Sequence, residues 1–392
     1  MSHVRRALAW CGALTVTLTF TTSLAPSAHA TDPASQATAD AAVTWLEAQQ
    51  QADGGFELAA FPGFETRDAA LAIAEDAQTG TTWNTSEALA ALAALHFGGT
   101  PAGATPLDAL DDYAATITTA GAAAKTIVLS ASPLGLDPAA FDAAGDGSPV
   151  DLVALLDAGC GTDTASFGPA FSDTLYGILA KKLVCGSAPA AALATVRAGQ
   201  QANGGWNFNG DPTGTDLDVD TTALAVEALV AGGAAGASDA NVGAALTFFA
   251  TNQQSSGAWQ SFGSDDPNST SLAIFGITAA GFDVESSCWR DTVDPGSSGA
   301  AYASPTAWLR SQQLTTPPAD AGRIASPNDG FGVNTFATSQ TVEGLLQSWL
   351  PITRAAAQTC DVPVTPVTPV TPVGPAPTGA APVVAATPRF TG

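Results

Sequence analysis

The chain has 392 residues and carries 36 acidic side chains against 12 basic ones, which gives a formal net charge of −24 at pH 7. A protein this acidic repels phosphate backbones and anionic headgroups. We therefore expect no nucleic-acid partner and no attachment to anionic lipid.

The first thirty residues have the pattern of a signal peptide. Arg5 and Arg6 precede an apolar run from Ala7 to Phe20, and Ala28-His29-Ala30 is the small-x-small pattern of signal peptidase cleavage. We expect residues 1–30 to be removed and the protein to be secreted. No other apolar run approaches the roughly 18 residues that would span a bilayer, so we expect no transmembrane segment in the mature chain.

The cysteines indicate disulfides. One of the five leaves with the signal peptide, and the four that remain are Cys160, Cys185, Cys288 and Cys360. An even number in an exported chain is typical of two disulfides. Three connectivities are open, and we favour the sequential one, in which Cys160 pairs with Cys185 and Cys288 pairs with Cys360.

In chain order, helical patterns dominate. An Ala-rich helix over 34–51 ends at a Gly-Gly turn followed by Phe56, and returning helices follow over 66–77 and 84–97. We expect two more helical hairpins over 106–131 and 150–156. A shortened copy of the same loop and helix start begins at Phe167.

The stretch from Gln200 to Val230 is the clearest unit of a repeat. A helix ends in a Gln pair, a Gly-Gly turn leads to Trp206, and after a polar loop Asp and Thr open a second apolar helix. Val219, Ala223, Val226 and Val230 form the stripe of a helix with one buried face. Related copies contain Trp259 and Phe331 at the same place. With the copies at Phe56, Phe167 and Trp206 they make five recognisable copies.

Helical hairpins of this kind bury their apolar faces only against their neighbours, so they stack in a row or close into a ring. Signals for β-strands are almost absent. We expect one all-α domain over residues 31–360. Residues 361–392 are rich in Pro, Thr and Val and predict a disordered spacer.

The Gln-Gly-aromatic segments over 49–56, 200–206, 253–259 and 312–331 resemble the Gln-Trp repeats of squalene-hopene cyclases and the wider prenyltransferase and terpene-cyclase-like α/α toroids. The resemblance covers most of residues 34–350. It implies an α/α toroid. The larger gaps between copies have room for further hairpins, so we expect about 12 helices in all. The resemblance also implies a stabilising role for Gln201, Trp206, Gln254 and Trp259, because in that family the Gln joins helix ends and the aromatic packs beside it.

Asp218-Val219-Asp220-Thr221-Thr222-Ala223 resembles the Asp-x-Asp-Asp-Thr-Ala catalytic run of the cyclases, with Thr221 in place of the third Asp. The resemblance implies that Asp220 is a general acid and Asp218 its partner. Such an acid needs an apolar cavity, aromatic walls and a neighbour that keeps it protonated. Helix capping also explains Asp173, Asp220 and Asn268, so both interpretations of Asp220 stay open.

Metal sites have little support. The zinc ligands of the prenyltransferase branch are Asp, Cys and His, and the mature chain has a single His, His96, far from any Cys. Asp211, Asp216 and Asp218 form a weak candidate Ca²⁺ site, and we expect no other cofactor. Cys160 and Gly161 match the start of the Cys-Gly-Glu-Gln thioester motif, but the Gln is missing, so we interpret Cys160 as a disulfide partner.

Aromatic and acidic residues suggest other sites. Trp206, Phe208, Trp259 and Phe331 are candidates for lining a space for an apolar ligand or a glycan, although such residues often pack loops. Acid pairs for glycoside hydrolysis stay open, because the separation of the candidates in space is unknown. These candidates are Glu57, Glu65, Asp68, Glu87, Asp216, Asp218, Asp220 and Glu227.

Two functions remain. The leading interpretation is a non-catalytic binding or surface-display module, secreted or held at the cell envelope by its Pro-rich spacer, with a small apolar ligand, a glycan or an envelope protein as partner. Export favours it, since intracellular cyclases draw isoprenoids from the membrane or cytosol. The alternative is an isoprenoid- or lipid-modifying enzyme that uses Asp220 as general acid.

Overall fold

The computed structural model describes residues 32–57, 65–80, 82–156, 159–214, 217–286, 288–293, 303–329, 334–351 and 353–354. These residues form the helices α1 to α15, a few single-turn helices and two short β-hairpins. The predicted all-α class is confirmed. The predicted signal peptide and Pro-rich tail lie outside the described residues, so the domain boundaries stay predictions.

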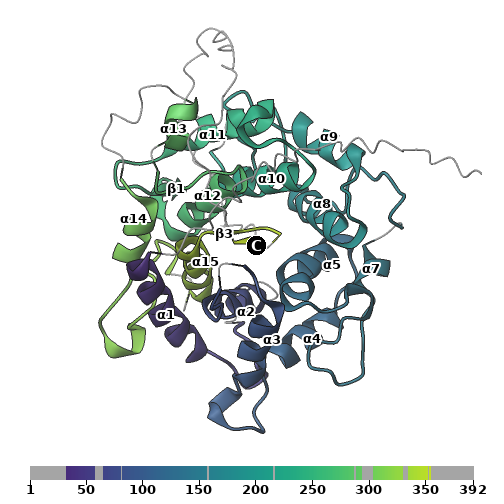
Figure 1. Ribbon diagram of the computed structural model, residues 1–392, viewed down its shortest axis with the longest axis vertical. Coiled ribbons are helices and arrows are strands. Elements are labelled where there is room, and N and C mark those ends of the chain that lie inside the picture. Colours follow the sequence, from purple (N-terminus) through teal and green to yellow (C-terminus); the bar gives the residue numbers. More distant parts are fainter. Residues whose placement is uncertain are drawn as a thin grey trace, which may run out of the picture.

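Six helical segments stand side by side around a common axis (Figure 1). They are α2 (Glu65–Asp76), α5 (Ala120–Thr126) with the π-helical η2 (Ile127–Ala131) and α6 (Ser132–Leu134), α8 (Phe171–Cys185), α10 (Val219–Ala231), α12 (Pro267–Ala279) and α15 (Thr335–Leu346). Each packs against the next, and α15 packs against α2, so the inner helices form a closed ring.

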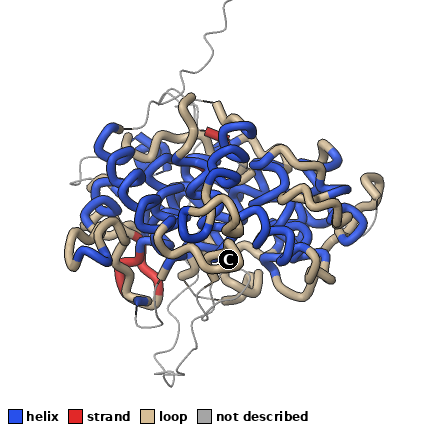
Figure 2. The backbone as a smooth tube through the Cα atoms, turned by 90° about the horizontal axis from the view of Figure 1, so that it is seen from below, coloured by secondary structure: helices blue, strands red, loops and turns tan. Residues whose placement is uncertain are grey.

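The remaining helices lie outside this ring and cover it (Figure 1). They are α1 (Pro33–Glu47), α3 (Thr85–Ala94), α4 (Pro106–Ala114), α7 (Leu152–Leu155), α9 (Ala190–Ala198), α11 (Ala240–Asn252), α13 (Cys288–Val293) and α14 (Pro305–Ser311). Seen from the side, the two layers form a disc (Figure 2). The predicted α/α toroid is therefore confirmed. No described helix is long and apolar enough to cross a membrane.

Inner and outer helices differ in burial because only the outer layer faces solvent. The outer helix α3 buries Ala88 and Leu92, whereas every residue of α12 except Leu272 is buried. Close packing of the inner helices depends on small residues. A Cβ atom added at Gly344 on α15 would come within 2.8 Å of the Ser271 hydroxyl on α12. Polar side chains on such helices must therefore find partners inside the protein.

The Gln of each repeat joins neighbouring repeats. Gln200 Nε2 donates to the carbonyl oxygens of Gly204 (2.7 Å) and of Asn241 on α11 (2.8 Å). Gly204 has a φ of +90°, and a side chain there would collide with the Ala244 carbonyl, so the turn requires glycine. The joining side chain in this repeat is thus the first Gln of the pair.

In the pairs Gln200–Gln201 and Gln253–Gln254 the second Gln makes a local contact instead, whereas in the last pair the second residue, Gln313, is the joining one. Gln201 Nε2 donates to the carbonyl of Asp211, and Gln254 Nε2 donates to the carbonyl of Asn252. The resemblance placed the joining role on Gln201 and Gln254, which is one residue too late in each repeat. The backbone explains the shift, because the N–H of the second Gln is already bonded within the turn, as in Gln201 N to Gly205 O.

Trp206 and Trp259 tie the outer helices to the inner ones. The indole N–H of Trp206 donates to Val196 O (2.6 Å) at the end of α9, and that of Trp259 donates to Phe249 O (2.9 Å) on α11. Their backbone N–H groups donate to Thr222 and Thr270, in the first turns of α10 and α12. Both side chains are completely buried, in the stabilising role that the resemblance implies.

A disulfide joins Cys160 to Cys185, the last residue of α8. This half of the predicted pairing is confirmed, and it accounts for Cys160 as we interpreted it. The side chain of Cys288 and the whole of Cys360 lie outside the described residues. The second disulfide therefore stays a prediction.

The two β-hairpins lie at opposite ends of the disc (Figure 2). β1 (Trp259–Ser261) and β2 (Ser264–Asp266) lead into α12, whereas β3 (Ser348–Trp349) and β4 (Thr353–Arg354) follow α15. In Figure 1, β3 lies over the centre of the ring. Leu350 N donates to Glu227 Oε1 (2.7 Å) and the Ser348 hydroxyl donates to Glu75. The C-terminal hairpin therefore lies across the end of the ring at which the inner helices finish.

Candidate functional site

Asp218 caps helix α10. Its Oδ1 accepts the backbone N–H of Thr221 (2.9 Å), and its Oδ2 accepts the Thr221 hydroxyl (2.8 Å). The interpretation of Asp220 as the helix cap was therefore wrong, because the cap lies two residues earlier. Thr221, which stands where the cyclase run has its third Asp, gives Asp218 two hydrogen-bond donors. Both donors favour the ionised form of Asp218.

Asp220 lies in the first turn of α10, and its carboxyl approaches the start of α12. The side chain is half-buried, but its Oδ1 is fully enclosed and has no hydrogen-bond partner among the described residues. Burial, and after it the negative charge of Asp218, raise the pKa of Asp220 to about 8, although a hydrogen bond with Ser269 acts in the opposite direction. Asp220 is consequently protonated at neutral pH.

The first turn of α12 completes this group. Asp266 caps α12 by accepting the backbone N–H groups of Asn268 and Ser269, and it also accepts the side-chain amide of Asn328. Burial raises the pKa of Asp266 to about 6. The predicted cap at Asn268 was wrong, since its side chain instead donates to Gln340 Oε1 (3.0 Å) on α15. Because Asp220 meets Ser269, α10 and α12 begin at the same end of the ring.

Sequence reasoning placed one acid at its helix start correctly. The Asp173 carboxylate accepts the backbone N–H of Ala170, as expected of a residue that stabilises the first turn of α8.

The aromatic candidates divide into two groups. Trp206 and Trp259 have no accessible surface, so neither is open to a ligand in this structure. Their burial between helix layers explains why the prediction of a ligand-lining role does not hold for them. Phe208 is half-buried, and Phe331 lies outside the described residues.

The candidate Ca²⁺ group is not brought together by any described contact. Asp211 Oδ1 accepts the backbone N–H and the hydroxyl of Thr213, and these bonds lower the pKa of Asp211. Both oxygens of Asp218 are bonded to Thr221. Asp216 lies outside the described residues, so a calcium site at Asp211, Asp216 and Asp218 stays a prediction.

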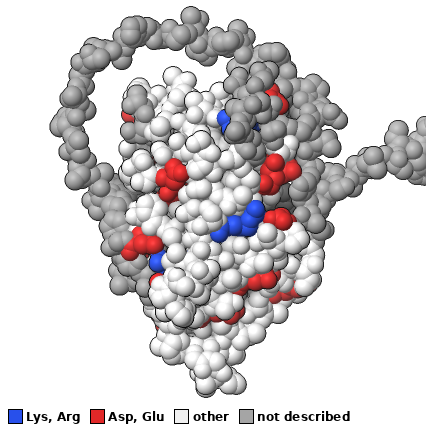
Figure 3. Space-filling model, turned by 90° about the vertical axis from the view of Figure 1, so that its left-hand side faces the viewer, with Lys and Arg blue, Asp and Glu red and all other residues white. Residues whose placement is uncertain are grey.

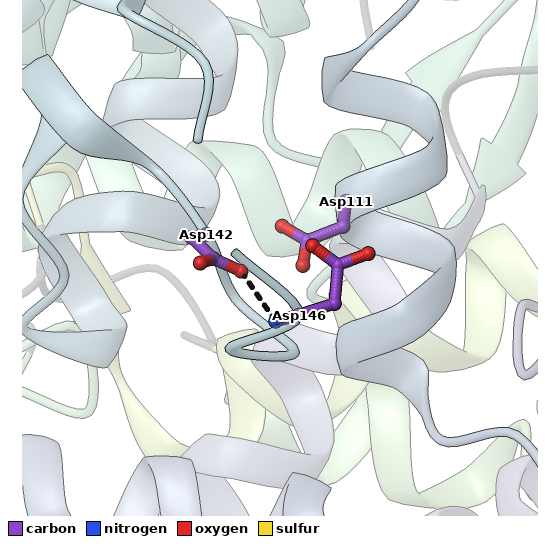
Figure 4. A group of neighbouring side chains, drawn as sticks. All are labelled: Asp111, Asp142 and Asp146. Atoms are coloured by element: carbon purple, nitrogen blue, oxygen red, sulfur yellow. Dashed lines mark hydrogen bonds between the residues drawn. The ribbon is translucent and has the colours of Figure 1, made fainter. Parts of the chain in front are cut away.

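A different set of acids lies close enough together to bind a metal ion. Asp111 on α4 faces Asp142 and Asp146 from a neighbouring loop, with one oxygen of each within 4.8 Å of the others (Figure 4). Asp111 accepts the backbone N–H groups of Ala143 and Ala144, both at 2.6 Å. Asp142 Oδ1 likewise accepts the N–H of Asp146 (2.9 Å). These bonds give the carboxylates a role in fixing the loop.

Ionisable side chains also converge inside the ring. Asp68 and Glu75 on α2, Glu227 on α10 and Glu343 on α15 are all buried, and we call these four the axial acids. Burial raises the pKa of Glu227 to about 8. It also raises the pKa of Glu343, an effect strengthened by the other three axial acids.

Two bases and a tyrosine join the axial acids. Arg67 on α2 lies over the ring of Tyr113 at 4.6 Å, and Lys125 on α5 lies 5.5 Å from the ring of Tyr176 on α8. Burial, and then the charge of Arg67, hold the pKa of Lys125 well below its usual value. Sequence reasoning had noted Asp68 and Glu227 as acids of unknown separation and had missed the other members. A spacing of seven residues, from Asp68 to Glu75 as from Asp220 to Glu227, was the signal that could have found Glu75.

One described cavity borders this region. It has a volume of about 230 Å³ and lies between the start of α2 and α4, with Arg67, Glu57 and Tyr113 among its walls. On the outer face shown in Figure 3, acidic residues are scattered among neutral ones, and basic residues form only small patches. That face includes no broad basic surface of the kind that nucleic acids require.

Comparisons with known proteins identify the fold. No family model matches the chain, and no curated protein matches it. Two similar solved structures are variants of the type II terpene cyclase MstE from Scytonema. A Tyr-to-Phe variant without ligand is 16% identical with a TM-score of 0.51, and an Asp-to-Ala variant in complex with the product merosterolic acid A is 17% identical with a TM-score of 0.50. Each covers 80% of this chain and 96% of the cyclase chain. At this identity the likeness establishes a terpene-cyclase-like fold.

Proposed function

We propose that this chain is a cyclase-like enzyme that protonates an isoprenoid or a related unsaturated lipid, with Asp220 as the general acid. The observation that carries the proposal is the state of the Asp220 carboxyl. It is protonated at neutral pH, and its enclosed Oδ1 has no partner among the described residues. A carboxylic acid with an enclosed, unpartnered oxygen is a suitable proton donor to a weakly basic alkene or epoxide.

Asp218 would hold the proton on Asp220. Its carboxylate is fixed by Thr221, and its negative charge opposes ionisation of Asp220. The resemblance assigns the same pair of roles to these residues. The absence of a third Asp therefore removes no group that either role needs.

The proposed reaction is an isomerisation. The proton moves from Asp220 to one carbon of an alkene, or to the oxygen of an epoxide whose C–O bond then breaks. The next alkene closes a ring onto the resulting carbocation, and a proton is finally lost to water. Solvent then returns a proton to Asp220, so no other reactant is consumed.

This proposal reverses the order of the two functions that the sequence suggested. The shared fold and the product complex of the Scytonema enzyme support an apolar ligand and a cyclase more than a non-catalytic module. Secretion and a cell-envelope location stay predictions, because they rest on residues outside the described part of the chain. A glycan or protein partner also stays a prediction.

The test is an assay in D₂O with squalene, 2,3-oxidosqualene and geranylgeraniol dispersed in detergent. We expect an isomer of one substrate, detected by gas chromatography and mass spectrometry. An isomer of squalene or geranylgeraniol should contain one carbon-bound deuterium from solvent, whereas the deuteron added to 2,3-oxidosqualene goes to the epoxide oxygen and becomes an exchangeable hydroxyl. Asp220→Asn should lower the rate by at least about 100-fold, since an amide cannot donate the proton. Asp265→Asn, which makes the same chemical change at a half-buried residue of β2, should react like the parent. Substrate that is bound but recovered unchanged would instead support the binding module.

A further inference from the structure

Four turn glycines identify an equivalent position in four repeats. A Cβ atom added to any of them would come within 2.8 Å of a backbone carbonyl oxygen in, or just before, a neighbouring outer helix. The pairs are Gly54 with Thr105, Gly204 with Ala244, Gly257 with Ser304 and Gly322 with Ala41. The residues about one helical turn after these carbonyls are Ala109, Phe248, Trp308 and Trp45. Of the four repeats compared, the first alone has a small side chain there.

The central repeat shows how a ring fills this position. A Cβ atom added at Gly205 would lie 2.7 Å from the Phe248 ring and 3.0 Å from the Thr222 hydroxyl. Phe248 is only 1% accessible, and its counterpart Trp45 is 4% accessible. Both rings are therefore part of the packed interior beside their turns.

In the first repeat the ring is missing and a cavity takes its place. A Cβ atom added at Gly55 would again lie 3.0 Å from a threonine hydroxyl, that of Thr66, but its other neighbour is the methyl group of Ala109, at 3.3 Å. These three residues line the cavity of about 230 Å³ between α2 and α4. An apolar cavity of roughly 150 Å³ is large enough to bind benzene. This cavity can therefore hold an aromatic ring from a ligand.

The same repeat differs from the others on α2. The threonine hydroxyls that accept the N–H of the residue after the turn belong to Thr66, Thr222, Thr270 and Thr338. The residues that follow these threonines are Arg67, Ala223, Ser271 and Ser339. Arg67 is 3% accessible, donates to the Thr126 hydroxyl (3.1 Å) and lies over the ring of Tyr113. A guanidinium group thus replaces a small side chain in the wall of the cavity, and it attracts the faces of aromatic rings.

The acids among the lining residues favour a cation. They are Asp53, Glu57 and Asp112, against the single base Arg67. Glu57 Oε1 accepts the backbone N–H of Thr66 at the start of α2 (3.1 Å). Asp53 and Asp112 are exposed, so the cavity meets solvent beside them. An ammonium group held at that side would be attracted by both carboxylates.

We propose that this cavity binds a small aromatic amine. The aryl ring takes the place that Phe248 fills in the central repeat and contacts Leu110 and the Arg67 guanidinium. The ammonium group lies at the exposed side, near Asp53 and Asp112. The proposed general acid is not among the lining residues, so this inference does not depend on the proposed function.

The test measures the affinity of 2-phenylethylammonium for the full chain by calorimetry. Its neutral analogue 2-phenylethanol should bind about threefold to thirtyfold more weakly, because exposed ion pairs contribute modestly to binding. The cyclohexyl analogue 2-cyclohexylethylammonium should also bind more weakly, because it offers Arg67 no aromatic face. Ala109→Phe fills the cavity with the residue type of the central repeat. It should raise the melting temperature and lower the affinity for the aryl amine at least about tenfold.

A second variant keeps the inference testable where the filled variant does not fold. Asp53→Asn with Asp112→Asn removes both charges but keeps an acceptor for the bond that Asp53 Oδ1 makes in the turn. In this variant the amine should bind no better than the alcohol. Glu47→Gln with Asp40→Asn is the matched control, since it removes two exposed acids of α1 that do not line the cavity. It should bind the amine like the parent.

The outcomes also separate this inference from the proposed function. Asp220→Asn should bind the aryl amine like the parent, even though that variant loses cyclisation. The inference is overturned if the amine does not bind, or binds no better than the alcohol or the cyclohexyl analogue. It is equally overturned if the amine keeps its affinity in the folded Ala109→Phe variant or in the variant without the two mouth carboxylates.

Discussion

The side-chain amide of Gln313 donates a hydrogen bond of 2.8 Å to the backbone carbonyl of Thr38, a residue 275 positions earlier in the chain. The same amide donates to Gly322 O (3.1 Å). Gln313 thus repeats the contact that Gln200 makes between adjacent repeats, but it joins the last repeat to the first. The type of hydrogen bond that connects adjacent repeats therefore also joins the two ends of the ring.

Replacing Gln313 with Ala should therefore weaken the closure. The loss of two hydrogen bonds at a half-buried site should lower the free energy of unfolding by about 1–3 kcal/mol, measured by urea denaturation. Gln254→Ala is the matched control, since among the described residues the Gln254 side chain bonds locally, to Asn252 O. If both variants lost the same free energy of unfolding, the hydrogen bond from Gln313 to Thr38 would stabilise the protein no more than a local one does.

Asp220→Asn should change how stability depends on pH. The folded protein holds the Asp220 proton up to about pH 8, whereas an unfolded Asp releases it near 3.8. The stability contributed by this group is complete below about pH 4 and is lost as pH rises toward 8, by up to about 1.4 kcal/mol per pH unit. The variant lacks this term, so its unfolding free energy should fall less between pH 5 and pH 7.5. Parallel curves for the variant and the parent would refute the raised pKa.

Asp218→Asn tests the partner role without removing the cap. Asn caps helices about as well as Asp, so the stability at pH 5 should change by less than about 0.5 kcal/mol. The negative charge that helps to raise the pKa of Asp220 is lost. The pKa of Asp220, followed by carbon-13 NMR of labelled aspartate, should therefore move below about 8. The basic limb of the cyclisation profile should move with it, and an unchanged carboxyl titration would contradict the assignment.

Removal of the disulfide should be costly. Cys160 and Cys185 are separated by 25 residues, and a crosslink of that span stabilises a protein by about 3 kcal/mol through the unfolded chain. We expect the double variant Cys160→Ser with Cys185→Ser to lose about that much in urea denaturation. If there is no further disulfide, a reducing agent should lower the unfolding free energy of the parent to about that of the double variant. A larger effect of reduction would indicate the predicted second bridge.

The sequence predicted the fold well because its signals repeat. The Gln-Gly-aromatic turn and the helix that follows it recur in each repeat, and the structure confirms the helical ring. The assignment of single polar side chains was less successful. Neither Asp220 nor Asn268 is a cap, because caps at the start of α10 and α12 are the earlier acids, Asp218 and Asp266. A run of several polar residues does not reveal which of them lies just before the helix as its N-cap.

The axial acids illustrate a second limit. Glu343 is an ordinary acid on an apolar helix when it is considered alone. Its raised pKa comes from burial and then from the charges of Asp68, Glu75 and Glu227, which lie far from it in the sequence. No local pattern records that three separate segments meet at one axis. The spacing of Glu75 and Glu227, seven residues after Asp68 and Asp220, shows only that two helices each present acids on one face.

Ring closure also bears on how the chain folds. Contacts between successive repeats are near in sequence and can form early, as in an open solenoid. The contacts of α1 with α15 and of Thr38 with Gln313 need both ends of the domain at once. An arc of repeats that lacks its last member leaves the faces of α1 and α2 uncovered, and such exposed apolar surfaces favour association with other chains. A growing chain of this kind therefore stays exposed to aggregation until its ring is complete.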